Sequence, residues 1–262
     1  MALTLSRELV VVKFGSDLVA NQSGVDETRI EGYAQGLSEQ LQEQNIIVVT
    51  SGAIAVGKAI AREHGRNPDT FSPSVLAGMG SNAIMGAWQN AFAKQDVITS
   101  SILVTHHEIK EEHEGSMLIR TLTDGIARGV VPVVNENDAL SDVEVMRLLT
   151  GGDNDGLATH VASAMGAQGL RLFTAEGGVY DEQGELISVI DRSNISSVEM
   201  ILGARGNGVV SANGRGGMLS KVRAANNFVT IGDVRGRWAE ISKPNEAMTG
   251  ENITRVIRDR YS

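Results

Sequence analysis

LVVVKFGSD, residues 9–17, is an apolar run that ends in Lys13 and a Gly-Ser pair, as expected of a buried strand entering a loop. A polar segment with helical character follows over 26–44, and a second apolar run, NIIVVTSG, occupies 45–52. Short apolar strands that alternate with longer amphipathic helices are typical of a parallel sheet covered on both faces. These residues therefore predict an α/β fold, a three-layer α/β/α sandwich with a mostly parallel sheet.

The rest of the chain continues this alternation of apolar runs and amphipathic segments. The further predicted strands are 97–105, 129–134, 169–174 and 227–233. The further predicted helices are 53–64, 74–94, 116–128, 155–166 and 217–226. Two β-prone runs around Glu182-Gln183-Gly184 predict a hairpin over 177–190, at a face or rim of the main sheet. Because we find no internal repeat or linker, we expect one domain over 1–262.

Composition excludes several classes of function. The net charge is −9 and acidic and basic residues are interspersed, so duplex nucleic acid is a poor candidate partner. A chain without cysteine has no disulfide, thiolate zinc site or cysteine nucleophile. No apolar stretch reaches the ~18 residues of a membrane span, and the N-terminus does not read as a signal peptide. We expect a soluble cytoplasmic protein that can still bind a small anion through local lysines and backbone amides.

Two lysines point to a phosphoryl group. Lys13 lies at a strand end, and Lys221 follows the glycine-rich stretch NGRGGMLSK, 213–221, that leads into a predicted helix. Glycines at a helix start let backbone N–H groups approach an anion, and two ammonium groups can neutralise a phosphoryl group during its transfer. The alternatives are a solvent-exposed stem for Lys13 and a tight loop without a ligand before Lys221.

Short polar side chains gather in two further stretches, NEND at 135–138 and GGDND at 151–155. These side chains are more numerous than helix capping by Asp153 or Asp155 requires, so they could bind an ammonium group and position the lysines or Mg²⁺. A solvated acidic loop is the alternative. Ser51, after the strand at 45–52, could contact a carboxylate or only cap the following helix.

Several other residues are expected to have structural rather than functional roles. The stretch HHEIKEEHE, 106–114, suggests a metal cluster, but its high charge is more simply that of a solvated segment. We therefore expect no protein side chain to be a metal ligand. Met79, Met85 and Trp88 are expected to pack in the core. A P-loop motif is absent from the sequence, so phosphate binding must use another architecture.

Taken in order, several blocks of the sequence resemble the glutamate 5-kinases, which have the amino acid kinase fold. The blocks are VVVKFGSDLV (10–19), VVTSGAIAVGKA (48–59), GVVPVVNENDAL (129–140), GGDNDGLATHVASAMGA (151–167), LFTAEGGVYDEQGELI (172–187) and GGMLSKVRAA (216–225). The joint occurrence of NEND and GDND is the specific part of the resemblance, which covers about residues 8 to 235. Uridylate, carbamate and acetylglutamate kinases share the fold, but their corresponding loops look less similar.

The resemblance implies transfer of the γ-phosphoryl group of ATP, with Mg²⁺, to the side-chain carboxylate of L-glutamate, in the first step of proline biosynthesis. The implied catalytic residues are Lys13, Lys221 and Asp155, where Asp155 orients the two lysines. The implied glutamate-binding residues are Ser51, Gly52, Asn135, Asp138 and Asn154. The implied nucleotide-binding residues are Lys13, Thr174, Ala175, Arg215, Gly216, Gly217, Met218, Leu219, Ser220 and Lys221. The resemblance also implies that proline is a candidate feedback ligand and that the protein forms a homo-oligomer.

The chain departs from the family pattern at several positions. Ala175 stands where the family usually has Asp, and Arg215 where it has a small polar residue; Met79-Gly80-Ser81 and the segment 117–120 also differ. The family's C-terminal PUA domain has no room within these 262 residues, so we expect a kinase domain without it. These departures leave two alternatives open, a related kinase with another acceptor and a non-catalytic amino-acid or nucleotide sensor.

Overall fold

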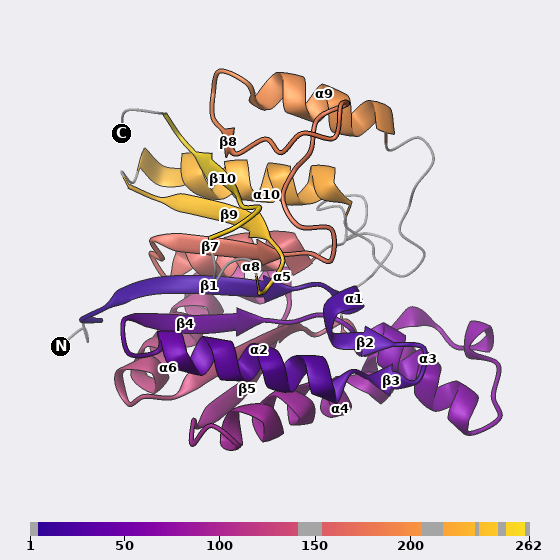
Figure 1. Ribbon diagram of the computed structural model, residues 1–262. Coiled ribbons are helices and arrows are strands. Elements are labelled where there is room, and N and C mark those ends of the chain that lie inside the picture. The colour runs from indigo at the N-terminus through magenta and orange to yellow at the C-terminus, as the bar shows by residue number, and fades with distance from the viewer. Residues whose placement is uncertain (1–4, 141–153, 206–216, 234–235, 246–249, 260–262) are drawn as a thin grey trace.

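The computed structural model describes residues 5–140, 154–205, 217–233, 236–245 and 250–259. Its centre is an eight-stranded sheet in the order β5-β6-β4-β1-β7-β9-β10-β8 (Figure 1). Neighbouring strands run parallel except β9 and β10, which are antiparallel. The predicted mostly parallel sheet is therefore confirmed.

The bounds of the elements follow the predicted alternation over most of the chain. The strands are β1 (Glu8–Phe14), β2 (Ala20–Asn21), β3 (Gly24–Val25), β4 (Gln44–Val49), β5 (Thr99–Val104), β6 (Val131–Glu136), β7 (Gly169–Phe173), β8 (Val189–Ile190), β9 (Trp238–Ser242) and β10 (Thr254–Ile257). The α-helices are α1 (Ser16–Val19), α2 (Glu27–Gln40), α3 (Ala53–Glu63), α4 (Pro73–Ala93), α5 (His106–Lys110), α6 (Glu112–Ala127), α8 (Asn154–Ala164), α9 (Ile195–Arg205) and α10 (Met218–Thr230). Short 3₁₀ turns cover Pro68–Thr70 and Ile231–Asp233.

Strand β1 separates the two hydrophobic cores of the sandwich. Successive side chains of a strand point to opposite faces, so Val10 and Val12 pack on one side and Val11 on the other. The first side is covered by α2 and α4, the second by α8 and α10 (Figure 1). The helices therefore form one layer on each face of the sheet.

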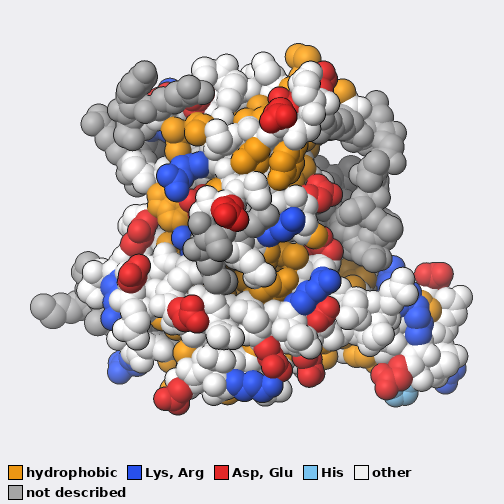
Figure 2. Space-filling view, viewed as in Figure 1, with side chains coloured by type: hydrophobic (Ala, Val, Ile, Leu, Met, Phe, Trp, Pro, Cys, Tyr) orange, Lys and Arg blue, Asp and Glu red, His pale blue; other side chains and the backbone are white. Residues whose placement is uncertain are grey.

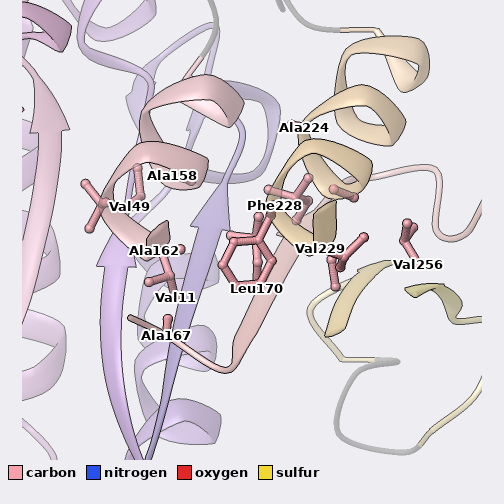
Figure 3. Close-up of a cluster of buried hydrophobic side chains, with 14 of the residues drawn as sticks. Val11, Val49, Ala158, Ala162, Ala167, Leu170, Ala224, Phe228, Val229 and Val256 are labelled. Atoms are coloured by element: carbon pink, nitrogen blue, oxygen red, sulfur yellow. The ribbon is translucent and has the colours of Figure 1, made fainter. Parts of the chain in front are cut away.

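Helix α8 packs closely on the sheet through small side chains. Ala158 and Ala162 face Val11 and Val49, and Phe228 of the neighbouring α10 lies beside them (Figure 3). Because alanine brings the helix axis near the strands, the start of α8 comes within side-chain reach of the carboxyl ends of β1 and β4.

Two glycines let α3 and α4 cross with their backbones in contact. A Cβ atom on Gly57 would lie 1.9 Å from the carbonyl oxygen of Leu76, and one on Gly80 would lie 2.0 Å from that of Ala53. Such distances are far inside van der Waals contact, so only glycine fits. This crossing fixes the position at which α3 begins, directly after β4.

The C-terminal part differs most from the sequence-based expectation. The predicted strand at 227–233 is wrong, because α10 continues to Thr230 and a 3₁₀ turn follows. Phe228 and Val229 of this run are buried, at helical spacing from buried Val222 and Ala225, so they lie on the inner face of a helix. Helix α9 and strands β9 and β10 were not predicted.

The predicted hairpin is present in reduced form. Tyr180 and Leu186 form a single antiparallel bridge around the turn, and β8 then joins the edge of the sheet beside β10. On the surface, Figure 2 shows acidic and basic side chains interspersed over the viewed face. Among the described residues no helix combines the length and apolarity that crossing a membrane would require.

Candidate active site

A carboxylate between two ammonium groups lies at the carboxyl edge of the sheet. Lys13 is the penultimate residue of β1, Asp155 lies in the first turn of α8, and Lys221 lies in the first turn of α10. Lys13 Nζ is 2.6 Å from Asp155 Oδ1, and Lys221 Nζ is 3.1 Å from Asp155 Oδ2. The structure thus brings together three residues that are far apart in the sequence.

Burial makes these ion pairs energetically important. The side chains are 2%, 0% and 8% exposed for Lys13, Asp155 and Lys221. A buried charge is tolerated only when it is paired, and Asp155 pairs with both lysines at once. Two ammonium groups and one carboxylate carry one net positive charge, which suits an anionic ligand at this edge.

A second group, which we call the amide cluster, consists of Thr50, Ser51, Asn135 and Asn154. The side-chain Nδ2 of Asn154 donates to Thr50 O at 2.7 Å, Ser51 Oγ at 2.9 Å and Asn135 Oδ1 at 3.1 Å. Asn135 is buried, and its Nδ2 has no hydrogen-bond partner within the part of the chain that the structure describes. Because a buried amide donor left unpaired is unfavourable, this group is suited to binding a ligand oxygen.

The amide cluster and the lysines are joined by sequence adjacency. Asn154 and Asp155 are consecutive residues of α8, so one helical turn carries the centre of each group. Thr159, one turn further, donates to Asp155 O at 3.0 Å and to Ala224 O of α10 at 3.3 Å. This bond couples the two helices that carry Asp155 and Lys221.

Gly52 shapes the turn between β4 and α3. Its φ is +102°, and a Cβ atom would lie 3.0 Å from Val19 Cγ2 and 3.2 Å from Ile84 Cδ1. Gly52 is the N-cap of α3 and the cap makes no side-chain hydrogen bond. The alternative in which Ser51 caps this helix is therefore wrong, and Ser51 Oγ instead accepts from Asn154.

Asp138 follows β6 in a turn and is half-buried. The turn is held by Asn137 N, which donates to Val104 O at 2.8 Å, and by Leu140 N, which donates to Asn137 O at 2.9 Å. Asp138 thus lies three residues beyond Asn135 of the amide cluster. Asp153 lies outside the described residues.

Thr174 and the start of α10 are the described parts of the predicted nucleotide side. Thr174 is buried at the end of β7, where its N–H donates to Ser242 O at 3.0 Å, whereas Ala175 is exposed. Gly217 is the N-cap of α10 without a side-chain cap bond, and Met218, Leu219 and Ser220 form its first turn with Lys221. Arg215 and Gly216 lie outside the described residues.

Sequence reasoning missed Thr50 and its contact with Trp88. Trp88 is fully buried, as expected of core packing, but its Nε1 also donates to Thr50 Oγ1 at 2.9 Å. Thr50 in turn offers its carbonyl oxygen to Asn154. A buried tryptophan usually finds a hydrogen-bond acceptor, which is the only signal that could have indicated this support.

The expectation of a solvated 106–114 segment is wrong for His106. His106 is 2% exposed, and its Nδ1 lies 2.9 Å from Nδ1 of His160 on α8. Burial, followed by His160 and Lys110, lowers the pKa of His106 to about 4, and burial also lowers the pKa of His160. Over the described ranges, no group of three His, Asp or Glu side chains could hold a metal ion.

Comparison with known proteins gives the family. The model of the amino acid kinase family matches residues 8–237. A glutamate 5-kinase of Shouchella clausii is 33% identical over 226 residues, and one of Myxococcus xanthus is 32% identical over 247. These alignments cover 85% and 88% of this chain but 60% and 63% of the relatives, so the chain spans about 60% of their length.

Solved structures agree on the fold. Carbamate kinase from Giardia superposes with a TM-score of 0.67 at 14% identity, covering 97% of this chain and 100% of that one. UMP kinase from Ureaplasma parvum superposes with a TM-score of 0.60 at 13% identity, covering 97% of each. The match over 8–237, together with this fold, shows that the chain belongs to the amino acid kinase family.

Proposed function

We propose that this chain transfers the γ-phosphoryl group of ATP to the side-chain carboxylate of L-glutamate. The observation that carries the proposal is the buried Lys13–Asp155–Lys221 group directly beside the amide cluster. The lysine group is suited to neutralising the charge of a phosphoryl group, and the amide cluster is suited to binding an amino acid. The similarity to glutamate 5-kinases supports the choice of acceptor.

The proposed transfer requires that the glutamate carboxylate and the γ-phosphoryl group are positioned and that the repulsion between their negative charges is neutralised. A glutamate side chain, with an ordinary pKa of about 4.3, is already ionised at neutral pH, so its attack needs no general base. The obstacle is the approach of two anions, which positive groups between them relieve. Lys13 and Lys221 would carry this out, and Asp155 would hold the two ammonium groups apart and in place.

The acceptor would lie against the amide cluster. Asn154 and Asn135 present amide groups, and Ser51 a hydroxyl, which can hydrogen-bond a carboxylate. Asp138, in the turn after β6, supplies the negative charge that an α-ammonium group requires. Together these groups would select an α-amino acid with a second carboxylate.

The nucleotide would lie along α10 and the end of β7. A helix N-terminus with Gly217 as its cap favours phosphate through its N–H groups and dipole. Carbamate kinase from Giardia lamblia, which shares this fold, is known bound to AMP-PNP. We infer that Mg²⁺ arrives with ATP, because Asp155 is engaged by both lysines and Mg²⁺ is often held mainly by substrate phosphates.

Several expectations from the sequence stay predictions. These are a single domain over 1–262, a homo-oligomer, proline as a candidate feedback ligand and a cytoplasmic location. The acceptor is also a proposal, since carbamate and UMP kinases share the fold.

The test is formation of γ-glutamyl hydroxamate from ATP, Mg²⁺, glutamate and hydroxylamine. We expect product from the wild type and a loss of at least about a thousandfold in Lys221→Met, which removes the charge and keeps the volume. Lys94→Met is the matched control, because Lys94, the C-cap of α4, is exposed and paired with Glu31, and the variant should keep full activity.

The same preparation separates the alternatives. ADP release would be measured with glutamate, aspartate, N-acetylglutamate, carbamate and UMP as acceptors. Turnover with another acceptor but not with glutamate would reject the proposed acceptor and retain the kinase. Calorimetric binding of ATP and glutamate without turnover with any acceptor would indicate a sensor.

A further inference from the structure

Two buried imidazoles lie on the flank of the candidate site. His106 is the first residue of α5, which follows β5 after the N-cap Thr105, and His160 lies on α8. Their Nδ1 atoms are 2.9 Å apart, and the rings meet edge to face with centroids 5.1 Å apart. Since one ring nitrogen must donate and the other accept, the bond fixes the direction in which each ring faces.

The His106–His160 pair is energetically unfavourable if its only role is to fill the core. His106 Nε2 is buried and has no hydrogen-bond partner among the described residues. Both rings are disfavoured as cations, because burial lowers the pKa of each. An apolar side chain would fill the same volume without an unsatisfied nitrogen, so packing alone does not account for His106.

His106 contacts α8 at two points one turn apart. A Cβ atom added to Gly156 would lie 3.5 Å from His106 Cε1, so the ring packs against that residue, and His160 is four residues further on the same helix face. Gly156 directly follows Asn154 and Asp155. A directional bond at this place therefore restrains rotation of the helical turn that carries both.

We propose that His106 is a positioning residue for the phosphoryl transfer proposed above, acting through its hydrogen bond to His160 and its contact with Gly156. The pair holds the first turn of α8 so that Asp155 stays between the two lysines and Asn154 stays against Ser51. The inference rests on the proposed function for its kinetic consequence, but its structural consequence can be measured separately.

The kinetic test compares two replacements of His106. His106→Leu keeps an apolar side chain without a hydrogen bond, whereas His106→Asn keeps a polar group near the position of Nδ1. For His106→Leu we expect kcat to fall about tenfold and KM for glutamate to rise, because a small misplacement of catalytic groups lowers the rate strongly. KM for ATP should stay within about twofold, and His106→Asn should recover most of the loss.

Equal kinetics in the Leu and Asn variants would overturn the inference, because the hydrogen bond would then have no positioning effect. If His106→Leu does not fold, His160→Leu breaks the same bond from the more exposed ring, and the same expectations apply.

Hydrogen exchange tests the structural step without turnover. In His106→Leu the amides of residues 158–161, which close the first turns of α8, should exchange about tenfold faster than in the wild type. Amides of β4 serve as the internal control and should not change. Faster exchange in a protein that phosphorylates no acceptor would reject the proposed function and keep the restraint on α8. Unchanged exchange in an active enzyme would reject the positioning role alone.

Discussion

Asp155 and Glu240 are both buried carboxylates held between two cations, and they differ in what those cations are. Asp155 lies between two lysine ammonium groups at the carboxyl edge of the sheet. Glu240, in the middle of β9, accepts from Arg171 Nε at 3.2 Å and from Arg255 Nη2 at 2.8 Å. The charge count is the same in both groups, one net positive charge.

The difference lies in solvent access and in the shape of the cations. Arg255 is 58% exposed, and the guanidinium of Arg171 also donates to Gln40, so water and neighbouring amides share the charge. Planar guanidinium groups bind a carboxylate in a fixed geometry, whereas an ammonium is a compact charge that can turn toward another anion. The net charge is therefore the same in both groups, and they differ in the burial of their cations and in the position of Asp155 at the carboxyl edge of the sheet.

Replacing Asp155 by Asn should have the largest effect. Both lysines would lose their buried counter-charge, which costs about 3–5 kcal/mol of stability when a buried pair is broken. We also expect kcat to fall at least about a thousandfold, because the lysines would no longer be held for transfer. The measurement is the hydroxamate assay with urea unfolding of the same preparation.

Activity of Asp155→Asn near that of the wild type would contradict this expectation and would place the chemistry elsewhere. Glu31→Gln removes an exposed carboxylate that pairs with a lysine, Lys94, and should change neither quantity.

Replacing Asp138 by Ala should affect one substrate more than the other. Loss of a charge-assisted bond to the α-ammonium group should raise KM for glutamate about tenfold to a hundredfold. KM for ATP should stay within about twofold, since Asp138 lies on the β6 side of the site. Steady-state kinetics with each substrate varied checks this, and Asp124→Ala on the exposed face of α6 is the control. A parallel rise in both KM values would mean that the turn after β6 is not specific to the acceptor.

Much of the fold between β1 and β6 could be predicted because β1, β4 and β6 each contain a continuous apolar run. Such runs are the signature of strands buried on both faces. The signal weakens in β9 and β10, where Glu240 and Arg255 interrupt the apolar pattern. No helix among the described residues covers their face of the sheet (Figure 1). At 227–233 β-prone residues formed a helix face, because packing on the sheet outweighs intrinsic preference.

The place of a candidate residue in the fold was predictable where the residue ends a strand or begins a helix, as for Lys13 in β1, Asn135 in β6 and Asn154 in α8. Thr50 was not, because it acts on Asn154 through a backbone carbonyl that any residue would supply. His106 was not, because its burial depends on a partner 54 residues away and not on its charged neighbours.

Replacing Glu240 by Gln sharpens the comparison between the two carboxylates. The change keeps the shape and one acceptor, and water reaches Arg255, so we expect a loss of about 1–3 kcal/mol in the free energy of unfolding. The kinetic constants should not change, because Glu240 lies in the middle of β9, away from the candidate site at the carboxyl edge of the sheet. Urea unfolding and the hydroxamate assay measure the two quantities. A fall in kcat like that of Asp155→Asn would show that the two groups are coupled.

A further prediction, confined to acid pH, concerns a buried group that is neutral instead of charged. The pKa of His106 is lowered from 6.5 to about 4, so between these pH values the unfolded chain binds more protons than the folded one. Stability from this group is therefore fully present above about pH 6.5 and falls by about 1.4 kcal/mol per pH unit as the pH drops toward 4. His160, whose pKa is also lowered, acts in the same direction.

Urea unfolding at about pH 7 and about pH 5 should thus show a smaller acid loss in His106→Asn than in the wild type. His107→Asn, one residue along and exposed, is the matched control and should lose as much as the wild type. An equal acid loss in wild type and His106→Asn would mean that His106 is not held neutral in the folded protein.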